Sequence, residues 1–230
     1  MTLPSPSFSS IPCNVLSDVA APGKWPLKLE DRVRRLRSVI LAGTCTQFVP
    51  YDDRYAEVLR NMRNAPENRR WLAQDDEITA VMQARWAEAY RRRVDDLCWI
   101  LEAPDGTFAG SVSLYDISPC SAETGRLVLD PQLARTTPLF LEVEFLLQQV
   151  AGRWLGLPEI TARVQKTNEK VIAMHNRVGF VHTGEASFRG RPYVHLSVAL
   201  PHTISPIARR LLMRAKTRAA ASLRPPPPPS

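Results

Sequence analysis

The chain has no run of roughly 18 apolar residues of the kind that spans a bilayer. Its first residues also lack a basic stretch followed by an apolar core, so a secretory signal peptide is not expected. These two absences disfavour a membrane-spanning or exported protein. We therefore expect a cytoplasmic protein without a membrane span.

Cysteine and histidine are scarce, and neither is clustered along the chain. The eight residues are Cys13, Cys45, Cys98, Cys120, His175, His182, His195 and His202. They include no CxxC pair and no closely spaced histidines, which argues against a zinc site. Because nothing indicates export, the cysteines are expected to be reduced thiols. The sequence therefore predicts no metal site.

The net charge of +7 lies mostly at the C-terminal end of the chain. Residues 201–230 hold six basic residues and no acidic one, whereas the other 24 basic residues nearly balance the 23 acidic ones. The six are Arg209, Arg210, Arg214, Lys216, Arg218 and Arg224. A body that is close to neutral does not favour binding to a phosphate backbone, so no nucleic-acid partner is expected.

The 230 residues, of which 44% are apolar and 23% charged, are enough for one domain with appended segments. Residues 1–43 are expected to be an N-terminal extension, partly irregular, with one amphipathic helix. Residues 44–200 are expected to form the globular domain. Residues 201–230 are expected to form a basic amphipathic helix and a proline-rich tail.

Apolar periodicity and turn residues predict alternating strands and helices. Helices are expected over residues 29–40, 52–62, 76–93, 138–155 and 169–177. Strands are expected over residues 45–49, 98–101, 108–114, 125–129, 160–164 and 193–200, with a further signal at Phe180. The turn Pro104-Asp105-Gly106 joins two of these strands into a hairpin. The order β-α-α-β-β-β-α-β-α-β-β predicts an α/β domain with a mixed sheet.

A last helix is expected over residues 204–215, where apolar residues share one face and arginines lie opposite. Five prolines near the end of the chain predict an extended polyproline conformation. We expect the helix to dock on its own domain. The alternative is a helix that contacts an acidic partner or a membrane surface.

Four strings along the chain resemble one enzyme superfamily in their order and spacing. They are LRNMRNAPENRRWL (59–72), DGTFAGSVSLYDI (105–117), SAETGRLVLDP (121–131) and KTNEKVIAMHNRVGFVHTGE (166–185). Together they resemble the GNAT N-acetyltransferases, and within them the branch that acetylates protein N-termini or nucleotide-linked amino sugars. The resemblance implies a mixed, mostly antiparallel sheet flanked by helices on both faces. It also implies direct transfer of an acetyl group from acetyl-CoA to an amine.

The resemblance places acetyl-CoA in a gap beside the strand Leu127, Val128 and Leu129. The exposed backbone of this strand is expected to bind the amides of the pantetheine arm. A pyrophosphate needs backbone N–H groups, which a loop before a helix supplies, and residues 134–137 occupy that place. Most members carry glycines there, but this chain has none, so Arg135, Thr136 and Thr137 are expected to take their role. The alternative is an ordinary connection capped by Thr136 or Thr137.

Amine acylation requires that the ammonium lose a proton and that the leaving thiolate gain one. Glu123 is the carboxylate expected to serve as base, the alternative being a solvated glutamate at a strand end. His175 stands where many members carry a tyrosine that protonates the thiolate, the alternative being a packed histidine. Asn168 resembles an asparagine near the thioester, and it equally fits a helix N-cap.

Tyr115 and Trp86 are expected to line the acceptor pocket, although aromatic residues at such positions are also typical of a core. The arginines of NRRW and YRRR have two interpretations. They are solvated surface residues, or Arg69, Arg70 and residues 91–93 hold an anionic acceptor.

Three functions remain open at this point. The first is an N-acetyltransferase that acts on a nucleotide-linked amino sugar or another small amine. The second is an acetyltransferase for a protein N-terminus. The third is a non-catalytic GNAT-like binding module that has lost its cofactor loop and acts through its basic tail.

Overall fold

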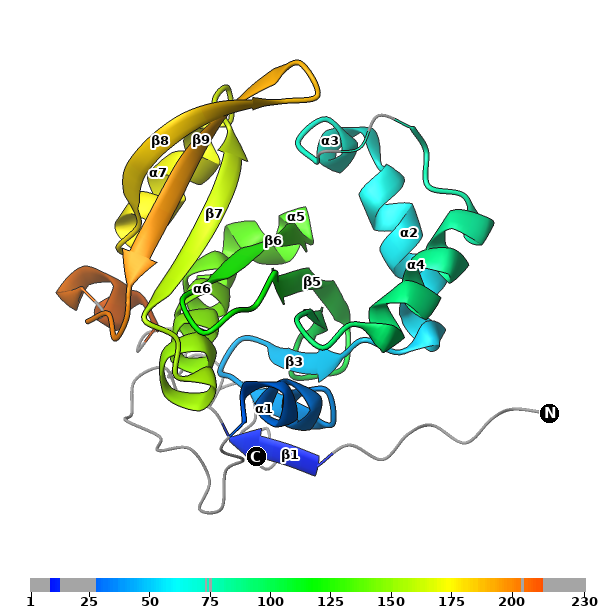
Figure 1. The fold of residues 1–230 in the computed structure, drawn as a ribbon, viewed down its shortest axis with the longest axis horizontal. Helices are drawn as coiled ribbons and strands as arrows, with labels where there is room; N and C mark the ends of the chain where they lie inside the picture. The colour runs from blue at the N-terminus through cyan, green and yellow to red at the C-terminus, as the bar shows by residue number, and fades with distance from the viewer. Residues whose placement is uncertain (1–8, 13–27, 73, 75, 204, 213–230) are drawn as a thin grey trace, which may run out of the picture.

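A mixed sheet of nine strands runs through the part of the chain that the computed structural model describes, namely residues 9–12, 28–72, 74, 76–203 and 205–212 (Figure 1). The strands are β1 (Ser9–Pro12), β2 (Val39–Ala42), β3 (Gln47–Pro50), β4 (Leu97–Glu102), β5 (Phe108–Tyr115), β6 (Ala122–Leu129), β7 (Glu159–Gln165), β8 (Val181–Phe188) and β9 (Arg191–Ala199). Their order is β1-β2-β3-β4-β5-β6-β7-β9-β8. Only β1–β2 and β6–β7 pair in parallel among these strands, which confirms the expected mixed, mostly antiparallel sheet.

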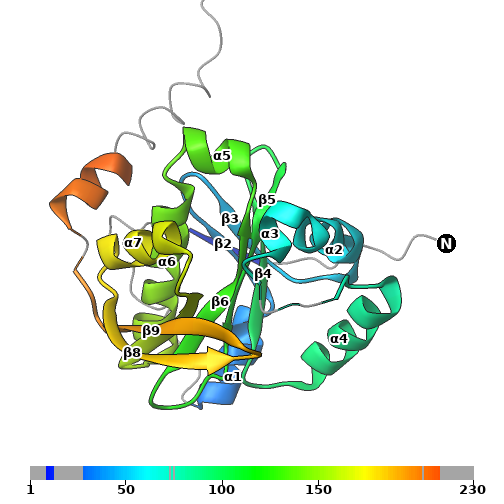
Figure 2. The same cartoon turned by 90° about the horizontal axis from the view of Figure 1, so that it is seen from above.

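Helices cover both faces of the sheet, as Figure 2 shows. They are α1 (Leu29–Leu36), η1 (Asp53–Tyr55), α2 (Ala56–Asn64), α3 (Pro66–Arg69), α4 (Ala80–Arg92), α5 (Pro131–Thr136), α6 (Leu139–Gln149), the π-helical segment η2 (Val150–Leu155) and α7 (Glu169–Arg177). Helices α2, α3 and α4 lie on one side of the sheet, and α6 and α7 lie on the other. The flanking helices predicted from the sequence are therefore confirmed.

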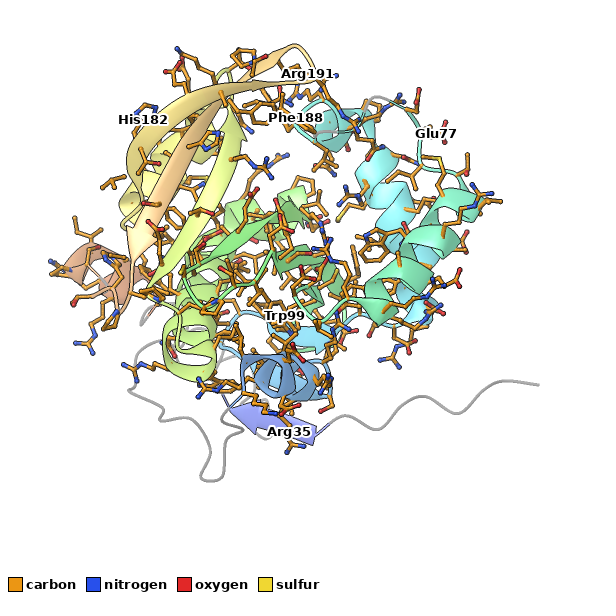
Figure 3. All side chains as sticks on the ribbon, viewed as in Figure 1. Arg35, Glu77, Trp99, His182, Phe188 and Arg191 are labelled. Carbon is orange, nitrogen blue, oxygen red and sulfur yellow. The ribbon has the colours of Figure 1, made fainter. Side chains whose placement is uncertain are left out.

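Strand β4 places apolar side chains on both faces of the sheet. Successive side chains of a strand point to opposite faces, so Leu97, Trp99 and Leu101 join the main core with α6. Figure 3 labels Trp99 inside this core. Ile100 points the other way and packs with Leu59 of α2 in a smaller cluster. An all-apolar strand is expected where both faces are covered.

Helix α1 and strand β2 belong to the same core, although they precede residue 44. Val33, Leu36, Val39 and Leu41 are each at most 1% exposed and lie in the main cluster. Strand β2 also pairs with β3 through Leu41 and Ala42. The division of the chain after residue 43 therefore cuts through elements that pack together.

The hairpin around residues 104–106 and the helix Glu169–Arg177 are confirmed. Other boundaries differ. Residue 40 was expected to end a helix but belongs to β2, and α4 begins after Thr79, whose side chain accepts a hydrogen bond from the Met82 N–H, rather than at residue 76. Helices α3 and α5 were not expected.

The described part of the expected C-terminal helix, residues 206–212, is helical. Ala208 and Leu212 are buried in the main core cluster, so this part docks on the domain itself. Residues 204 and 213–215 of the expected helix, and the proline-rich end, lie outside the described residues.

Within the described ranges, no helix is long and apolar enough to cross a membrane. The same residues contain no cluster of three or more histidines, cysteines or carboxylates that would suit a metal ion. Cys45, Cys98 and Cys120 are free thiols, and Cys13 lies outside the described residues.

Candidate active site

The site begins where β6 and β7 separate. These parallel strands pair only at Ala122–Ile160, Glu123–Thr161 and Thr124–Ala162. Beyond these pairs no ladder joins them, and a cavity of about 530 Å³ opens between residues 125–129 and residues 163–165. Leu127, Val128 and Leu129 line this cavity, so the backbone edge predicted for pantetheine faces open space.

A β-bulge shapes β6 at this point. Ser113 pairs with Gly125 and Ser111 pairs with Val128, so β6 contains one residue more than β5 in this stretch. Arg126 has a φ of 51°, in the left-handed region that a bulged residue adopts. A bulge bends its strand and increases its twist. The gap between β6 and β7 opens next to this bend.

Basic residues outnumber acidic residues on the cavity wall. The basic residues are Arg70, Arg126, Arg135, Arg163 and Lys170. The acidic residues on the wall are Glu67 and Glu144. Two of the exposed cations, Arg135 and Lys170, have no ion-pair partner within the described ranges. The charge balance therefore favours an anionic ligand such as a nucleotide phosphate.

The expected phosphate loop at residues 134–137 is wrong in its local structure. Residues Pro131–Thr136 form α5, whose N-terminus is capped by the Asp130 carboxylate through the N–H groups of Gln132 and Leu133. A proline at the first helical position and an aspartate before it are strong helix-start signals. The sequence thus contains local signals for this helix at Asp130 and Pro131.

Thr136 and Thr137 do not offer their hydroxyl protons to the cavity. The Thr136 hydroxyl donates to the carbonyl of Gln132, and the Thr137 hydroxyl donates to the carbonyl of Leu133, at 3.0 and 2.8 Å. Both residues thereby close the C-terminal turn of α5. Arg135 alone of the three lines the cavity. The first turn of α6 follows at once and has no side-chain cap, so its N–H groups remain candidates for a phosphate.

His175 lies on the inner side of α7 and is 5% exposed. Its ring packs edge-on against Phe140 and Phe180, with ring centroids 5.3 and 4.9 Å away. Nδ1 lies 2.9 Å from the carbonyl oxygen of Val171, which can only accept, so Nδ1 carries a proton. Burial lowers the pKa of the ring, and Nε2 is then the unprotonated nitrogen of a neutral imidazole.

Glu144 of α6 faces this nitrogen, with Oε1 3.7 Å from Nε2 of His175. The carboxyl is 1% exposed, and its Oε2 has no hydrogen-bond partner among the described residues. Burial raises the pKa of Glu144 to about 8, so the protonated acid predominates at neutral pH. Glu144 and His175 both line the cavity and together hold a transferable proton. Sequence reasoning did not select Glu144, because its apolar surroundings come from distant elements.

Glu123 is held by two hydrogen bonds and an ion pair. Its carboxylate accepts from the Tyr115 hydroxyl at 2.5 Å and from Arg163 Nε at 2.9 Å, and Arg163 Nη2 lies 2.9 Å from its other oxygen. Burial, followed by the charge of Glu123, raises the pKa of Tyr115. Neither Glu123 nor Tyr115 lines the 530 Å³ cavity, whereas Arg163 does. The arrangement positions Arg163 at the cavity wall.

Asn168 has both features that the sequence left open. It is the N-cap of α7, where its side chain accepts a hydrogen bond from the Val171 N–H, and it also lines the cavity.

A second pocket, of about 320 Å³, lies between α2, α4 and the face of β4–β6 that these helices cover. Of the two aromatic residues predicted to line an acceptor pocket, Trp86 lines this pocket and Tyr115 does not. Arg126 lines both this pocket and the cavity between β6 and β7. The bulge therefore brings the two spaces together at one residue.

The surface arginines 91–93 are engaged with carboxylates. Arg91 pairs with Asp53, Arg92 pairs with Glu88, and Arg93 pairs with Asp95 and Asp116. Arg70 lies over the Trp71 ring, 4.9 Å from its centroid, at the rim of the cavity. These contacts favour the solvated-surface interpretation for residues 91–93.

The tip of the β8–β9 hairpin contacts the segment that follows α3. Figure 3 shows Phe188 and Arg191 at the tip of this hairpin, beside α3. A side-chain N–H of Arg191 donates to the Leu72 carbonyl at 3.4 Å, and the Gln165 side chain donates to the Arg70 carbonyl at 3.0 Å. These two hydrogen bonds connect β9 and β7 with the segment that follows α3.

Comparison with solved structures identifies several proteins of the same fold. A spermidine N-acetyltransferase from Vibrio cholerae, solved with CoA and spermine, aligns with a TM-score of 0.62 at 13% identity over 68% of this chain and 96% of that one. A GCN5-related N-acetyltransferase from Brucella melitensis gives 0.59 at 20% identity over 81% and 86%. RimJ from Mycobacterium smegmatis, solved with CoA-disulfide, gives 0.60 at 18% identity over 74% and 88%.

No curated protein sequence matches this chain. The family model described as acetyltransferase (GNAT) domain matches residues 46–181, which is more than half of the chain. GNAT enzymes use acetyl-CoA as the acyl donor, the cofactor expected from the sequence. The match covers β3 to α7, and therefore the gap, the bulge and both spaces that meet at Arg126. The chain belongs to the GNAT acetyltransferase family.

Proposed function

We propose that this protein transfers an acetyl group from acetyl-CoA to the amine of a small molecule. The observation that carries this proposal is the meeting of two spaces at Arg126: a basic cavity between β6 and β7, and a smaller pocket beneath α2 and α4. A two-substrate transfer needs such adjoining sites, because the amine must lie within bonding reach of the acyl group.

The residues of the larger cavity suit acetyl-CoA, which when bound supplies an activated thioester. The free edge of β6 at Leu127–Leu129 presents backbone groups for an extended chain of amides. Arg135, Lys170 and the uncapped first turn of α6 would hold the phosphates. Thr124 Oγ1 is buried on the same wall without a hydrogen-bond partner among the described residues, which marks a wall built to receive a polar ligand.

Glu144 and His175 are the residues that we assign to proton transfer. A departing thiolate requires a proton, and the pair holds one on the cavity wall at neutral pH. In this assignment His175 Nε2 and Glu144 Oε1 act together, since the neutral ring has no proton at Nε2 to donate by itself. Glu123 acts as a positioning residue for Arg163 rather than as the base.

The pocket volume of about 320 Å³ favours a small acceptor over the N-terminal segment of a protein. Small-molecule sites start at roughly this size. The remaining alternative, a module without catalysis, makes the opposite prediction for acetyl-CoA binding.

The test is calorimetric titration of the whole chain with acetyl-CoA and with free CoA. We expect a micromolar dissociation constant, and a loss of roughly three- to tenfold for Arg135→Glu and for Lys170→Glu at low salt. Arg85→Glu is the matched control, because Arg85 is exposed on α4 and lines neither space. Absence of binding up to millimolar acetyl-CoA would leave the non-catalytic module as the function.

A further inference from the structure

Arg63, on the last turn of α2, is the cation in the smaller pocket that has no protein partner. Arg63 is partly buried, and desolvation of its guanidinium lowers its pKa. It makes no ion pair or hydrogen bond with another described residue, and its charged neighbour is the cation Arg126. A partly desolvated charge without a partner is costly to a fold.

Arg126 shows what a structurally satisfied arginine looks like in the same pocket. Its Nη1 donates to both carboxylate oxygens of Asp96 at 2.9 and 3.0 Å, and Asp96 is itself 1% exposed. The two arginines thus differ in one respect: the fold provides a carboxylate for Arg126, and none of the described residues provides one for Arg63.

The remaining lining of the pocket also suits an acid. It contains no aspartate or glutamate, and its uncharged polar residues are Gln83, Ser111 and Ser113. The Ser113 hydroxyl is 0% exposed and faces the Cys98 thiol, which also lines the pocket. The pocket therefore offers a guanidinium group that no described residue pairs with.

We propose that the amine acceptor carries an acidic group, a carboxylate or a phosphate, that Arg63 binds. This inference rests on the proposed acetyl transfer and names the class of its acceptor. The acid supplies the counter-charge that Arg63 lacks, and the small volume restricts the ligand to the size of an amino acid or a phosphorylated amino sugar.

The same charges disfavour a polyamine. The Vibrio cholerae structure of this fold was solved with spermine, a polycation. A polycation in the present pocket would face Arg63, whose charge no described carboxylate offsets, and no aspartate or glutamate lines the pocket to bind it. The two proteins are therefore expected to differ in acceptor charge despite their shared fold.

The experiment uses the full chain and acceptors matched in pairs that differ only in the acid. Glutamate against glutamine α-amide and glycine against glycinamide test a carboxylate, glucosamine 6-phosphate against glucosamine tests a phosphate, and spermidine is the cationic comparison. Acetylation is followed with acetyl-CoA, and binding of each acceptor is measured separately by calorimetry without cofactor. At least one acid is expected to exceed its neutral partner by on the order of tenfold to a hundredfold in kcat/KM and in affinity.

Three variants separate binding from folding. Arg63→Met is expected to abolish the preference for the acid, Arg63→Lys to retain part of it, and Arg85→Met, the exposed control, to leave it unchanged. The melting temperature of the free protein should rise in Arg63→Met, because an unpaired, partly buried charge is removed. A purely structural arginine would lower it.

The two proposals fail in different ways. If acetyl-CoA does not bind but an acid binds through Arg63, the acetyl transfer is wrong and the acidic ligand stands. If transfer occurs equally to acids and to their neutral partners, or if Arg63→Met keeps the acid preference, the acidic acceptor is overturned while the transfer stands. Failure of every acid to bind also overturns it.

Discussion

Two glutamates of α6, two positions apart, are both buried but serve different purposes. Glu142 is 0% exposed, and its two carboxylate oxygens accept from the N–H groups of Thr44 and Cys45, each at 2.6 Å. It fixes the turn between β2 and β3, where a Cβ on Gly43 would lie 2.7 Å from the Thr46 carbonyl oxygen. Glu144 has His175 beside it instead and faces the cavity.

Glu144→Gln should change how stability depends on pH. The pKa of Glu144 is about 8 in the folded state, against 4.5 for an unperturbed glutamate in the unfolded chain. Between these two pH values the folded state therefore binds one proton more than the unfolded state. The free energy of unfolding of the wild type therefore falls as pH rises between these two values. The glutamine of the variant does not titrate, so the variant does not lose this stability. We expect the stability of the variant relative to wild type to rise by roughly 3–5 kcal/mol from pH 4.5 to pH 8. Urea unfolding at several pH values measures it.

Glu142→Gln is the matched control for that change. A glutamine amide has one oxygen and one NH₂ group, so one of the two backbone donors loses its acceptor. We expect a loss of about 1–3 kcal/mol in the free energy of unfolding. Equal responses of the two variants would contradict the different roles assigned to these glutamates.

At the scale of elements, the contact of the Tyr115 side chain with β6 depends on a glycine. A Cβ on Gly125 would lie 2.8 Å from the Tyr115 hydroxyl oxygen and 3.2 Å from the nearest ring carbon. Tyr115 in turn donates to Glu123, which holds Arg163. The absence of one side chain therefore permits the contact that ties β5, β6 and β7 together beside the site.

Gly125→Ala should displace the Tyr115 ring and weaken this connection. We expect the free energy of unfolding to fall by about 1–3 kcal/mol, as for other overpacked positions. In the double variant with Tyr115→Phe, the hydroxyl oxygen that would lie closest to the new Cβ is absent. The losses in free energy of unfolding of the two single variants should therefore not add, and we expect a coupling energy of roughly 0.5–3 kcal/mol. Chemical denaturation of both single variants and the double variant measures it, and strictly additive losses would refute the steric explanation.

At the scale of the whole molecule, the domain starts before residue 44. Val33, Leu36, Val39 and Leu41 are buried against elements more than a hundred residues away in sequence. Each such side chain contributes about 1.5–3 kcal/mol when buried. Their sum is comparable with the total stability of a typical domain, roughly 5–15 kcal/mol.

A chain that begins at residue 44 should therefore fail to fold cooperatively. The comparison is a chain that ends at residue 212, which keeps Ala208 and Leu212 in the core and should melt as the full chain does. Near-ultraviolet circular dichroism and thermal melting distinguish the two truncations. A cooperative melt for residues 44–230 would show that the first 43 residues are an appended extension after all.

Local signals in the sequence were sufficient where an element depends on its own residues. The turn at residues 104–106 has an Asp105 side chain that accepts from the Thr107 N–H and a Gly106 at φ 85°, and both act within a few residues. Helix α7 likewise matches its predicted bounds, with Asn168 as its N-cap. The strings that resemble GNAT enzymes led to the family for the same reason, because they follow one another along the chain.

Other features were decided only by tertiary structure. The short strand β2 has apolar residues that also fit a helix, and pairing with β3 settles its conformation. The partnerless Arg63 and the acidic Glu144 carry no local mark, because desolvation is a sum over groups that the fold brings together from distant parts of the chain. The sequence by itself therefore determined the fold and the family. The tertiary structure decided which charges are buried, and with them the proposed proton store and the proposed acid-binding pocket.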